Sequence, residues 1–177
     1  MPETISSESI YDGRIFDVRI DTLRHEGSEY KREVVVHRGS AVIVPLFDDN
    51  SVALVRQYRH AAGEYLLEIP AGTLDPTDDT PEQGARRELE EEIGVIAENI
   101  EKIAEFYVSP GFLTEKMYVY LATGLTETQQ NLDDDEHVEI ERISLDRALE
   151  MTKTGEIADA KTIIGLTFAA EKLKQVL

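Results

Sequence analysis

The sequence predicts an α+β domain with a mixed sheet, preceded by a strand-rich N-terminal segment. Alternating apolar and polar residues recur in the N-terminal part of the chain, as expected of half-buried strands. The run from Thr80 to Gly94 has the start and stop signals of a helix, and two further helical stretches follow near the C-terminus. With 177 residues, 41% of them hydrophobic, the chain can bury a sizeable core. We expect an N-terminal β segment at residues 1–38 and the main domain at residues 39–177.

Strands are predicted in chain order after a short polar tail. Residues 15–23 alternate between apolar and polar side chains, and residues 30–37 are centred on three consecutive valines. Residues 41–47 and 52–58 flank a turn-forming Asp-Asp-Asn-Ser group, so we expect them to form a hairpin of buried strands. Further strands are expected at residues 65–69, 100–108, 116–122 and 138–143.

The first helix is the clearest local prediction. Thr80 is placed to cap its N-terminus, Pro81 suits its first position, and Gln83 can complete a capping box with Thr80. Gly94 is placed to end the helix in a left-handed conformation. Two C-terminal helices are expected near residues 146–154 and 158–176.

The composition excludes several classes of function. The chain has no Cys, so it cannot form a disulfide framework, a thiolate metal site, a Cys nucleophile or an iron–sulfur cluster. No apolar run approaches the ~20 residues that cross a bilayer, and the polar, acidic start does not resemble a signal peptide. A net charge of −18 argues against nonspecific nucleic-acid binding, which depends on basic patches. We therefore expect a cytoplasmic protein with no nucleic-acid or membrane partner.

The negative charge is concentrated in two segments. Residues 72–94 carry eight acidic and two basic residues, and residues 131–142 carry six acidic residues and one basic residue. The net charges are −6 and −5, so the two segments hold 11 of the 18 excess negative charges. Most runs of this kind are solvated faces. The order of residues in the first segment favours a site instead.

Glu88, Glu91 and Glu92 share one face of the first predicted helix, because residues three and four apart are neighbours. Like charges at this spacing destabilise a helix by roughly 0.2–0.5 kcal/mol per pair, and the helix dipole adds a penalty near the C-terminal end. A divalent cation removes the repulsion, and oxygen ligands on adjacent turns suit Mg²⁺ or Mn²⁺. Arg87 lies beside Glu88 and can orient a carboxylate without binding the metal.

The stretch from Gly72 to Val95, GTLDPTDDTPEQGARRELEEEIGV, resembles the Nudix box. That motif is a Gly, five residues, a Glu, seven residues, and then Arg-Glu-apolar-any-Glu-Glu-any-Gly-apolar. Its second half is matched in full, from Arg87 to Val95. The first half differs, because Asp79 stands where the motif has Glu and six residues separate it from Gly72.

The resemblance implies a Nudix fold, an α/β/α sandwich with a mixed sheet between helices, in which the box forms a loop–helix–loop. The family hydrolyses nucleoside diphosphates linked to another moiety. By position in the motif, Glu88 and Glu92 would be the main metal ligands, Glu91 would assist them, and the Ala71 carbonyl would be an additional ligand. The implied cofactor is Mg²⁺, with Mn²⁺ as a possible substitute, and Glu91 and Glu92 would also act in catalysis.

Segments outside the box resemble the ADP-ribose pyrophosphatase branch of that family. Residues 109–112 (SPGF) resemble its loop of the same sequence, although a Pro-Gly pair is also an ordinary turn between strands. Residues 55–59 (VRQYR) and 67–72 (LEIPAG) resemble the strand before the catalytic loop and the run into the box. Gly-Glu-Ile at 155–157 and Asp-Ala-Lys-Thr at 159–162 resemble its C-terminal helical region.

The branch also implies the remaining site residues. An acidic loop before a strand carries a proposed catalytic base, which aligns with Glu136, and Glu115 beyond the SPGF loop is a second candidate. Either could instead be a solvated acid. The predicted substrate-binding residues are Arg59, Arg56, Phe16, Tyr11 and Pro110.

These substrate-binding residues have alternative explanations. Arg59 is the first candidate for a phosphate or terminal-ribose contact and Arg56 the second, but either could be a surface charge. Phe16 and Tyr11 could stack on adenine, or pack in the core or a dimer interface. The family's N-terminal strands often pair across a two-fold axis, so the resemblance implies a homodimer.

The resemblance therefore predicts a Mg²⁺-dependent enzyme that hydrolyses ADP-ribose to AMP and ribose 5-phosphate. Two alternatives remain open. One is the same chemistry on another nucleoside diphosphate sugar or a dinucleotide, and the other is a non-catalytic protein that senses ADP-ribose. The complete Arg-Glu-Leu-any-Glu-Glu run favours the enzyme, because a sensor does not need the full set of ligands.

Overall fold

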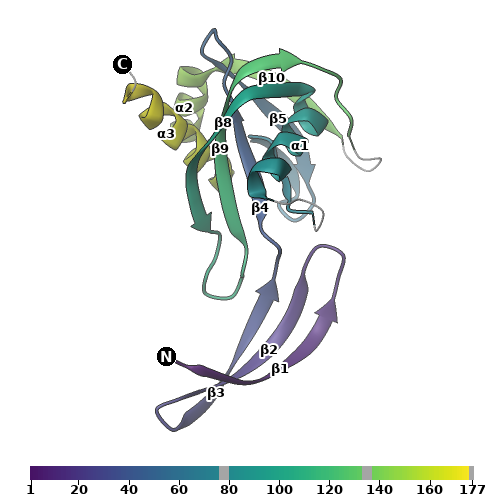
Figure 1. Ribbon diagram of the computed structural model, residues 1–177, viewed down its shortest axis with the longest axis vertical. Coiled ribbons are helices and arrows are strands. Elements are labelled where there is room, and N and C mark those ends of the chain that lie inside the picture. The colour runs from purple at the N-terminus through teal and green to yellow at the C-terminus, as the bar shows by residue number, and fades with distance from the viewer. Residues whose placement is uncertain (76–79, 133–136, 176–177) are drawn as a thin grey trace. The chain divides into compact units, whose positions relative to one another are not determined.

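The computed structural model divides the chain into two units (Figure 1). Unit 1 comprises Met1–Gly39 and Phe106–Met117, and unit 2 comprises Ser40–Glu105 and Tyr118–Leu177. No helix in the described part of the chain is long and apolar enough to cross a membrane. The structure describes residues 1–75, 80–132 and 137–175.

Unit 1 contains an antiparallel three-stranded sheet in the order β1-β2-β3. Glu26 and Gly27, both with positive φ, form the tight turn between β2 and β3, as two-residue hairpin turns require. The expectation of a polar tail is wrong for most of the N-terminus, which forms β1. Every residue of β1 is exposed, so the strand is made by backbone pairing with β2, and its few apolar residues do not form the alternating pattern of a half-buried strand. The strands are β1 (Glu3–Asp12), β2 (Asp17–His25) and β3 (Ser28–Val36).

Unit 2 is organised around two sheets. One has the strand order β7-β4-β9-β8 and the other the order β10-β5-β6. The central strand β4 is buried at every residue, and so is the first half of β5. The strands are β4 (Ser40–Pro45), β5 (Ser51–Arg59), β6 (Glu64–Glu68), β7 (Ala71–Thr73), β8 (Val95–Tyr107), β9 (Lys116–Glu127) and β10 (Val138–Ser144).

The predicted hairpin of β4 and β5 is wrong. The turn between them is present, because Phe47 N donates to Ser51 O and Asn50 has a φ of 62°. However, β4 pairs with β7 and β9, whereas β5 pairs with β6 and β10, and a single bridge joins Leu46 to Val52. Strands that are apolar on both faces can pair in either of two sheets, so hydrophobicity did not specify the partner.

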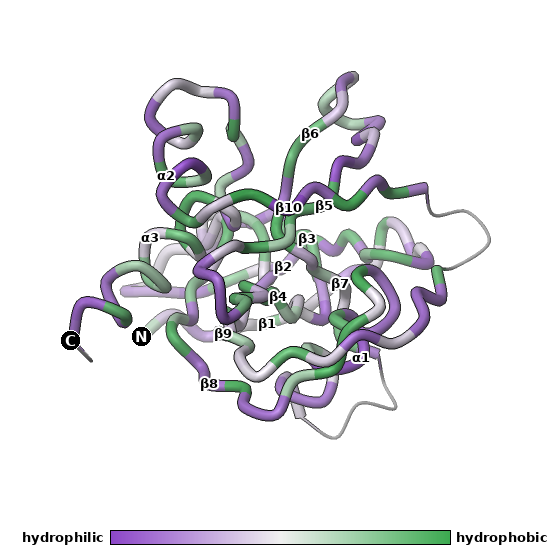
Figure 2. Tube along the Cα trace, turned by 90° about the horizontal axis from the view of Figure 1, so that it is seen from above, coloured by the Kyte–Doolittle hydropathy of each residue, from purple (hydrophilic) through white to green (hydrophobic). Residues whose placement is uncertain are grey.

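The first helix, α1 (Pro81–Ile93), forms as predicted. Thr80 is the N-cap and accepts a hydrogen bond from Gln83 N, and Gly94 ends the helix with a φ of 68°. The hydropathy along α1 changes between hydrophilic and hydrophobic (Figure 2), as expected of a helix with one buried face. That buried face includes Leu89 and also two of the predicted metal ligands.

The helices of unit 2 cover both sides of β4, with α1 on one side and α3 on the other (Figure 1). Ile43 belongs to the core cluster that includes Leu89 of α1, whereas a Cβ atom built at Gly165 of α3 would lie 3.2 Å from Val44 Cγ2. Because neighbouring residues of a strand point to opposite faces, the two helices pack on opposite sides. This arrangement confirms the predicted α/β/α sandwich. The two C-terminal helices are α2 (Leu145–Thr154) and α3 (Ala160–Lys174).

Candidate active site

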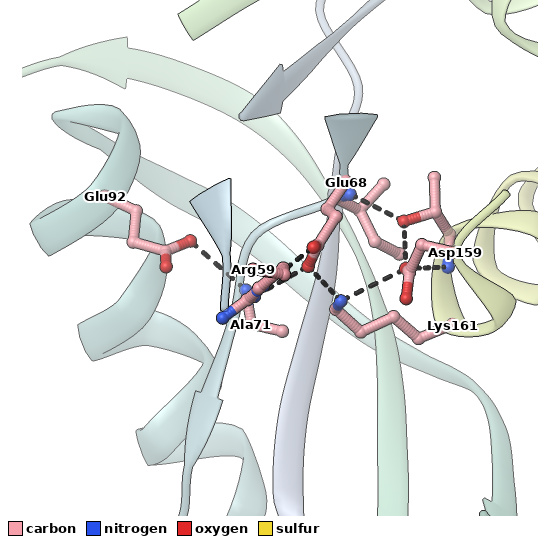
Figure 3. A network of polar contacts seen from close by, with 8 residues as sticks. Arg59, Glu68, Ala71, Glu92, Asp159 and Lys161 are labelled. Carbon is pink, nitrogen blue, oxygen red and sulfur yellow. Dashed lines mark hydrogen bonds and ion pairs between the residues drawn. The ribbon is translucent and has the colours of Figure 1, made fainter. Parts of the chain in front are cut away.

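The acidic face of α1 forms the centre of the candidate site. Glu88 and Glu92 are only 7% and 2% exposed, and Glu91 is partly exposed. Buried carboxylates need polar partners, and the Ala71 backbone N–H supplies one by donating to Glu92 Oε2 at 3.2 Å (Figure 3). The structure thus brings together α1 and the start of β7, as the sequence predicts for the metal ligands.

Gly72 allows this close approach. A Cβ atom built at Gly72 would overlap the carboxylate of Glu88, so a side chain at this position would displace it. Glycine in a strand often marks a place where another group must come close to the backbone. The carboxylate of Glu88 therefore lies directly against the backbone of β7, one residue after Ala71.

Arg87 connects the acids of α1 to each other. Its Nη1 donates to Glu88 Oε1 at 2.7 Å and to Glu91 Oε2 at 2.8 Å, and its Nη2 donates to Thr73 O at 3.4 Å. A guanidinium can bridge carboxylates in this way because its N–H groups form a rigid planar fork. Arg87 consequently holds two of the three predicted ligands in place, as its position beside Glu88 suggested.

The donor set of this site fits a hard divalent cation. Three carboxylates and a backbone carbonyl are ligands that Mg²⁺ prefers. Among the residues described, no three acidic or histidine side chains already converge as a metal-binding group, because Glu88 and Glu91 face Arg87 and Glu92 faces the Ala71 N–H. The metal-binding roles of Ala71, Glu88, Glu91 and Glu92 stay predictions.

A second cluster of charges is centred on Glu68 (Figure 3). Arg59 donates through Nε and Nη2 to the two oxygens of Glu68, at 2.7 and 2.6 Å. This is the bidentate geometry of the strongest arginine–carboxylate pairs. Lys161 donates to the same carboxylate and lies 3.1 Å from Asp159. We call these four residues the Glu68 network.

The pKa values in the Glu68 network reflect this pairing. Burial by itself raises the pKa of Glu68, but the hydrogen bonds from Arg59 and the charge of Lys161 outweigh it, so the pKa lies below its usual 4.5. The hydrogen bond to Glu68 raises the pKa of Arg59, and the charge of Glu92 adds to this effect. Arg59 therefore lies within electrostatic reach of the acidic face of α1.

Comparison with known proteins identifies the family. The family model described as NUDIX domain matches residues 37–164. The chain is 36% identical to the ADP-ribose pyrophosphatase of Bacillus subtilis (strain 168), across 99% of this chain and 95% of that protein. This chain belongs to the Nudix family. The predicted Nudix family and its hydrolase class are confirmed, and the predicted similarity to ADP-ribose pyrophosphatases is found in that relative.

Two further comparisons extend the assignment. The chain is 37% identical to the methanol dehydrogenase activator of Bacillus methanolicus, across 94% of this chain and 91% of that protein. The chain is also similar to a crystal structure of an ADP compounds hydrolase, with a TM-score of 0.86 and 24% sequence identity. The match covers 98% of this chain and 95% of the chain in that structure. At that identity the likeness concerns the fold, which it confirms to be the Nudix fold.

The two arginines before the Nudix box lie on different faces of β5. They are three residues apart, an odd spacing that places strand residues on opposite faces. Arg59 joins the Glu68 network, whereas Arg56 lies 3.8 Å from Glu141 and 5.7 Å from the ring centre of Tyr65. Arg56 and Tyr65 line a cavity of about 310 Å³ beside β10. Both arginines remain predicted substrate contacts.

The two aromatic candidates of this Nudix protein lie together in unit 1. The rings of Tyr11 and Phe16 are 5.8 Å apart between centroids. Tyr11 is 54% exposed and Phe16 is 42% exposed, so neither belongs to the core of the chain. Their proposed contact with adenine stays a prediction.

The SPGF loop of unit 1 is a hydrogen-bonded turn. Ser109 O accepts from Phe112 N and Leu113 N, at 3.2 and 3.0 Å. The Phe112 carbonyl in turn accepts from Val35 N at 2.7 Å, which fixes the loop to the end of β3. Pro110 is therefore part of an ordered turn, and its role in substrate binding stays a prediction.

The two candidate bases differ in what the structure says of them. Glu115 lies in unit 1, largely buried, with Oε1 3.7 Å from His37 Nδ1. Glu136 lies outside the described residues, and so does Asp79, the residue that departs from the Nudix box. The identity of the base stays a prediction.

Sequence reasoning missed the roles of Glu68, Asp159 and Lys161. Their segments resemble those of the family, but the resemblance assigns no chemistry to these side chains. A usable signal was present: Glu68 interrupts the apolar run of residues 66–70 (LLEIP). A charged residue in a buried strand must be paired, and the sequence could not say with which residues.

Proposed function

We propose that this Nudix protein hydrolyses the pyrophosphate bond of ADP-ribose, with Mg²⁺, to give AMP and ribose 5-phosphate. The observation that carries the proposal is the set of carboxylates that α1 holds against β7. A nearly full-length relative named ADP-ribose pyrophosphatase supports the choice of substrate. Phosphoryl transfer needs mainly positioning and charge stabilisation, and this arrangement of side chains can provide both.

Glu88, Glu91 and Glu92 would hold the cation together with the Ala71 carbonyl. When bound, Mg²⁺ would neutralise pyrophosphate oxygens and lower the pKa of the attacking water, and Mn²⁺ would serve as a substitute. Arg87 would keep the acidic side chains oriented, because it already contacts two of them. Glu91 and Glu92 would thereby contribute to catalysis as well as to binding.

Arg59 is the proposed contact for a phosphate or the terminal ribose. Its Nε and Nη2 are bonded to Glu68, so the Nη1 side of the guanidinium is the part that can meet a ligand. The Arg59 side chain is 39% exposed, which is enough for contact with a bound molecule. Arg56 is the second proposed contact.

Unit 1 would supply the remaining groups. The exposed rings of Tyr11 and Phe16 are suited to stacking on adenine. The exposed apolar residues Ile5 and Ile10 of β1, together with Tyr11, favour burial against a second copy of the chain. We therefore propose a homodimer, in which Pro110 would contribute to substrate binding.

The general base would be Glu136 or Glu115. Separate Glu136→Gln and Glu115→Gln variants decide between them by the pH dependence of kcat. Loss of the base should lower kcat by about 10²–10⁴-fold and remove one limb of the pH profile. If a variant keeps the wild-type kcat and pH profile, the residue replaced in it is not the base.

A second candidate function is regulation of another enzyme. The similarity to a protein named methanol dehydrogenase activator favours it. In that case the chain would bind a nucleoside diphosphate compound and act on a partner protein.

A product assay separates these functions. Purified protein with Mg²⁺ is incubated with ADP-ribose, other nucleoside diphosphate sugars and diadenosine polyphosphates, and the products are separated by chromatography. The proposal expects AMP and ribose 5-phosphate from ADP-ribose, at the highest kcat/KM of the panel. A higher value for another compound changes the substrate. Tight binding of ADP-ribose without release of AMP favours the regulatory function.

A further inference from the structure

The Glu68 network forms a line of alternating charges from the N-terminus of α3 to Arg59. Asp159 is the N-cap of α3 and accepts hydrogen bonds from the backbone N and the hydroxyl of Thr162, at 3.0 and 2.6 Å. Asp159 also lies 3.1 Å from Lys161 Nζ, Lys161 donates to Glu68, and Glu68 accepts both bonds from Arg59 (Figure 3). Among the residues that the structure describes, every member except Arg59 is thus held on both sides.

Lys161 is not needed to neutralise Glu68. The bidentate bond from Arg59 already satisfies both carboxylate oxygens of Glu68. Burying a lysine next to this pair adds a large desolvation cost, and apolar residues of similar volume would stabilise the fold at least as well. Lys161 is 8% exposed and Glu68 is 1% exposed, so this cost is incurred in full. Stability alone therefore does not account for the choice of a lysine at this position.

Lys161 affects how the guanidinium of Arg59 is held, because both side chains bond to Glu68. Glu68 Oε2 accepts from both Arg59 Nη2 and Lys161 Nζ, so the carboxylate that orients the guanidinium is itself tethered, and its charge is shared between two cations. The same turn of α3 also anchors the next residue of the chain, because Ile69 N donates to Thr162 Oγ1 at 2.9 Å. The N-terminus of α3 thus holds the segment between Glu68 and Ala71 from one side, and α1 holds its end.

We infer that Lys161 and Asp159 are positioning residues for Arg59. Acting through Glu68, they fix the plane of the Arg59 guanidinium and leave its Nη1 side available to a phosphate group of a nucleoside diphosphate substrate. This inference rests on the proposed function, in which Arg59 contacts the substrate. It assigns the network to the specificity of substrate binding, separate from the chemistry at α1.

The test is a double-mutant cycle measured as steady-state kinetics. Lys161→Met should raise KM by about tenfold and change kcat by less than about threefold, because an oriented, charge-assisted contact is lost from substrate binding. Arg59→Gln should raise KM at least as much. If Lys161 acts through Arg59, the double variant should have the KM of Arg59→Gln alone.

Two further variants keep the test decisive. Asp159→Asn preserves the helix cap, since Asn and Asp cap equally well, and should raise KM by about threefold in the wild-type background and not in the Arg59→Gln background. It carries the test if Lys161→Met does not fold. Lys172→Met removes another lysine of α3, one that pairs with Glu101 on the surface, and should leave KM unchanged.

The outcomes are distinct. If the increases in KM caused by Lys161→Met and Arg59→Gln multiply in the double variant, the positioning role is wrong and Lys161 is a structural residue. A loss confined to kcat would lead to the same conclusion. Failure of the proposed function would be seen in the wild-type protein, as absence of AMP from ADP-ribose. The cycle compares variants with each other on the best substrate of the panel, so it stays readable if that substrate is another nucleoside diphosphate.

Discussion

The two charged clusters of unit 2 differ in their balance of charge. On the acidic face of α1, the guanidinium of Arg87 pairs with two carboxylates, Glu88 and Glu91, and the third, Glu92, accepts from the Ala71 N–H. In the Glu68 network, two carboxylates meet two cations. Glu68 is even more buried than Glu92, at 1% against 2% exposed. Burial of a carboxylate therefore does not by itself indicate a metal site. An excess of carboxylates over cations favours one, because that excess can be offset by an added cation.

The largest expected effect tests the unbalanced cluster. Glu92→Gln should lower kcat by about 10³-fold, because it removes a ligand charge at the point where transition-state charge is stabilised. The melting temperature should stay near the wild-type value, since the Gln oxygen can still accept from the Ala71 N–H. The matched control is Glu90→Gln on the exposed face of α1. Equal rates in both variants would contradict the metal assignment.

The next effect tests the balanced cluster. Glu68→Gln removes the carboxylate that Arg59 and Lys161 share and leaves the buried Lys161 with only Asp159 as its anionic partner in the network, so it should cost about 3 kcal/mol of unfolding free energy, measured by urea denaturation. Because the pKa of Glu68 in the folded protein lies below 4.5, its stabilising contribution is complete above pH 4.5 and is lost as the pH falls through the lowered value. The variant should lack this part of the pH dependence. A cost under about 1 kcal/mol would show that the pairing of Glu68 with Arg59 and Lys161 contributes little to the stability of the fold.

A smaller effect compares the two clusters directly. Arg87→Gln removes the cation that Glu88 and Glu91 share, so in the absence of metal the melting temperature should fall by about 3–5 °C. Added Mg²⁺ should restore more stability to this variant than it adds to the wild-type protein. Glu68→Gln should show no such enhanced response. Equal Mg²⁺ responses in all three proteins would remove the distinction between the clusters.

The smallest effect comes from an exposed ion pair that serves as a baseline. Hydrogen bonds from Ser51 and Arg142 lower the pKa of Asp49 from 3.8 to about 2, although Asp49 is exposed. Its contribution to stability is therefore present above pH 3.8 and is lost as the pH falls to about 2. Asp49→Asn should change the urea midpoint slightly above this range and not below it. If Asp49→Asn shifts the urea midpoint as much as Glu68→Gln does, burial does not explain the difference between these two carboxylates.

Local features of the chain were predictable because their causes are local. The caps of α1 at Thr80 and Gly94 act within one turn of the helix. The shared face of Glu88 and Glu92 follows from the period of the helix. The same reasoning failed for β1, whose ten residues are all exposed and are held by pairing with β2.

The sequence by itself determined the acidic face of α1, the resemblance of its spacing to the Nudix box and the alternation of the main strands. Only the tertiary structure decided that β4 and β5 enter different sheets, because each is apolar enough to pair in either. It also decided that Arg59, Glu68 and Lys161 meet, from β5, β6 and α3. Partners of buried charges lie far apart in the chain, up to 93 residues here, and no local period relates them.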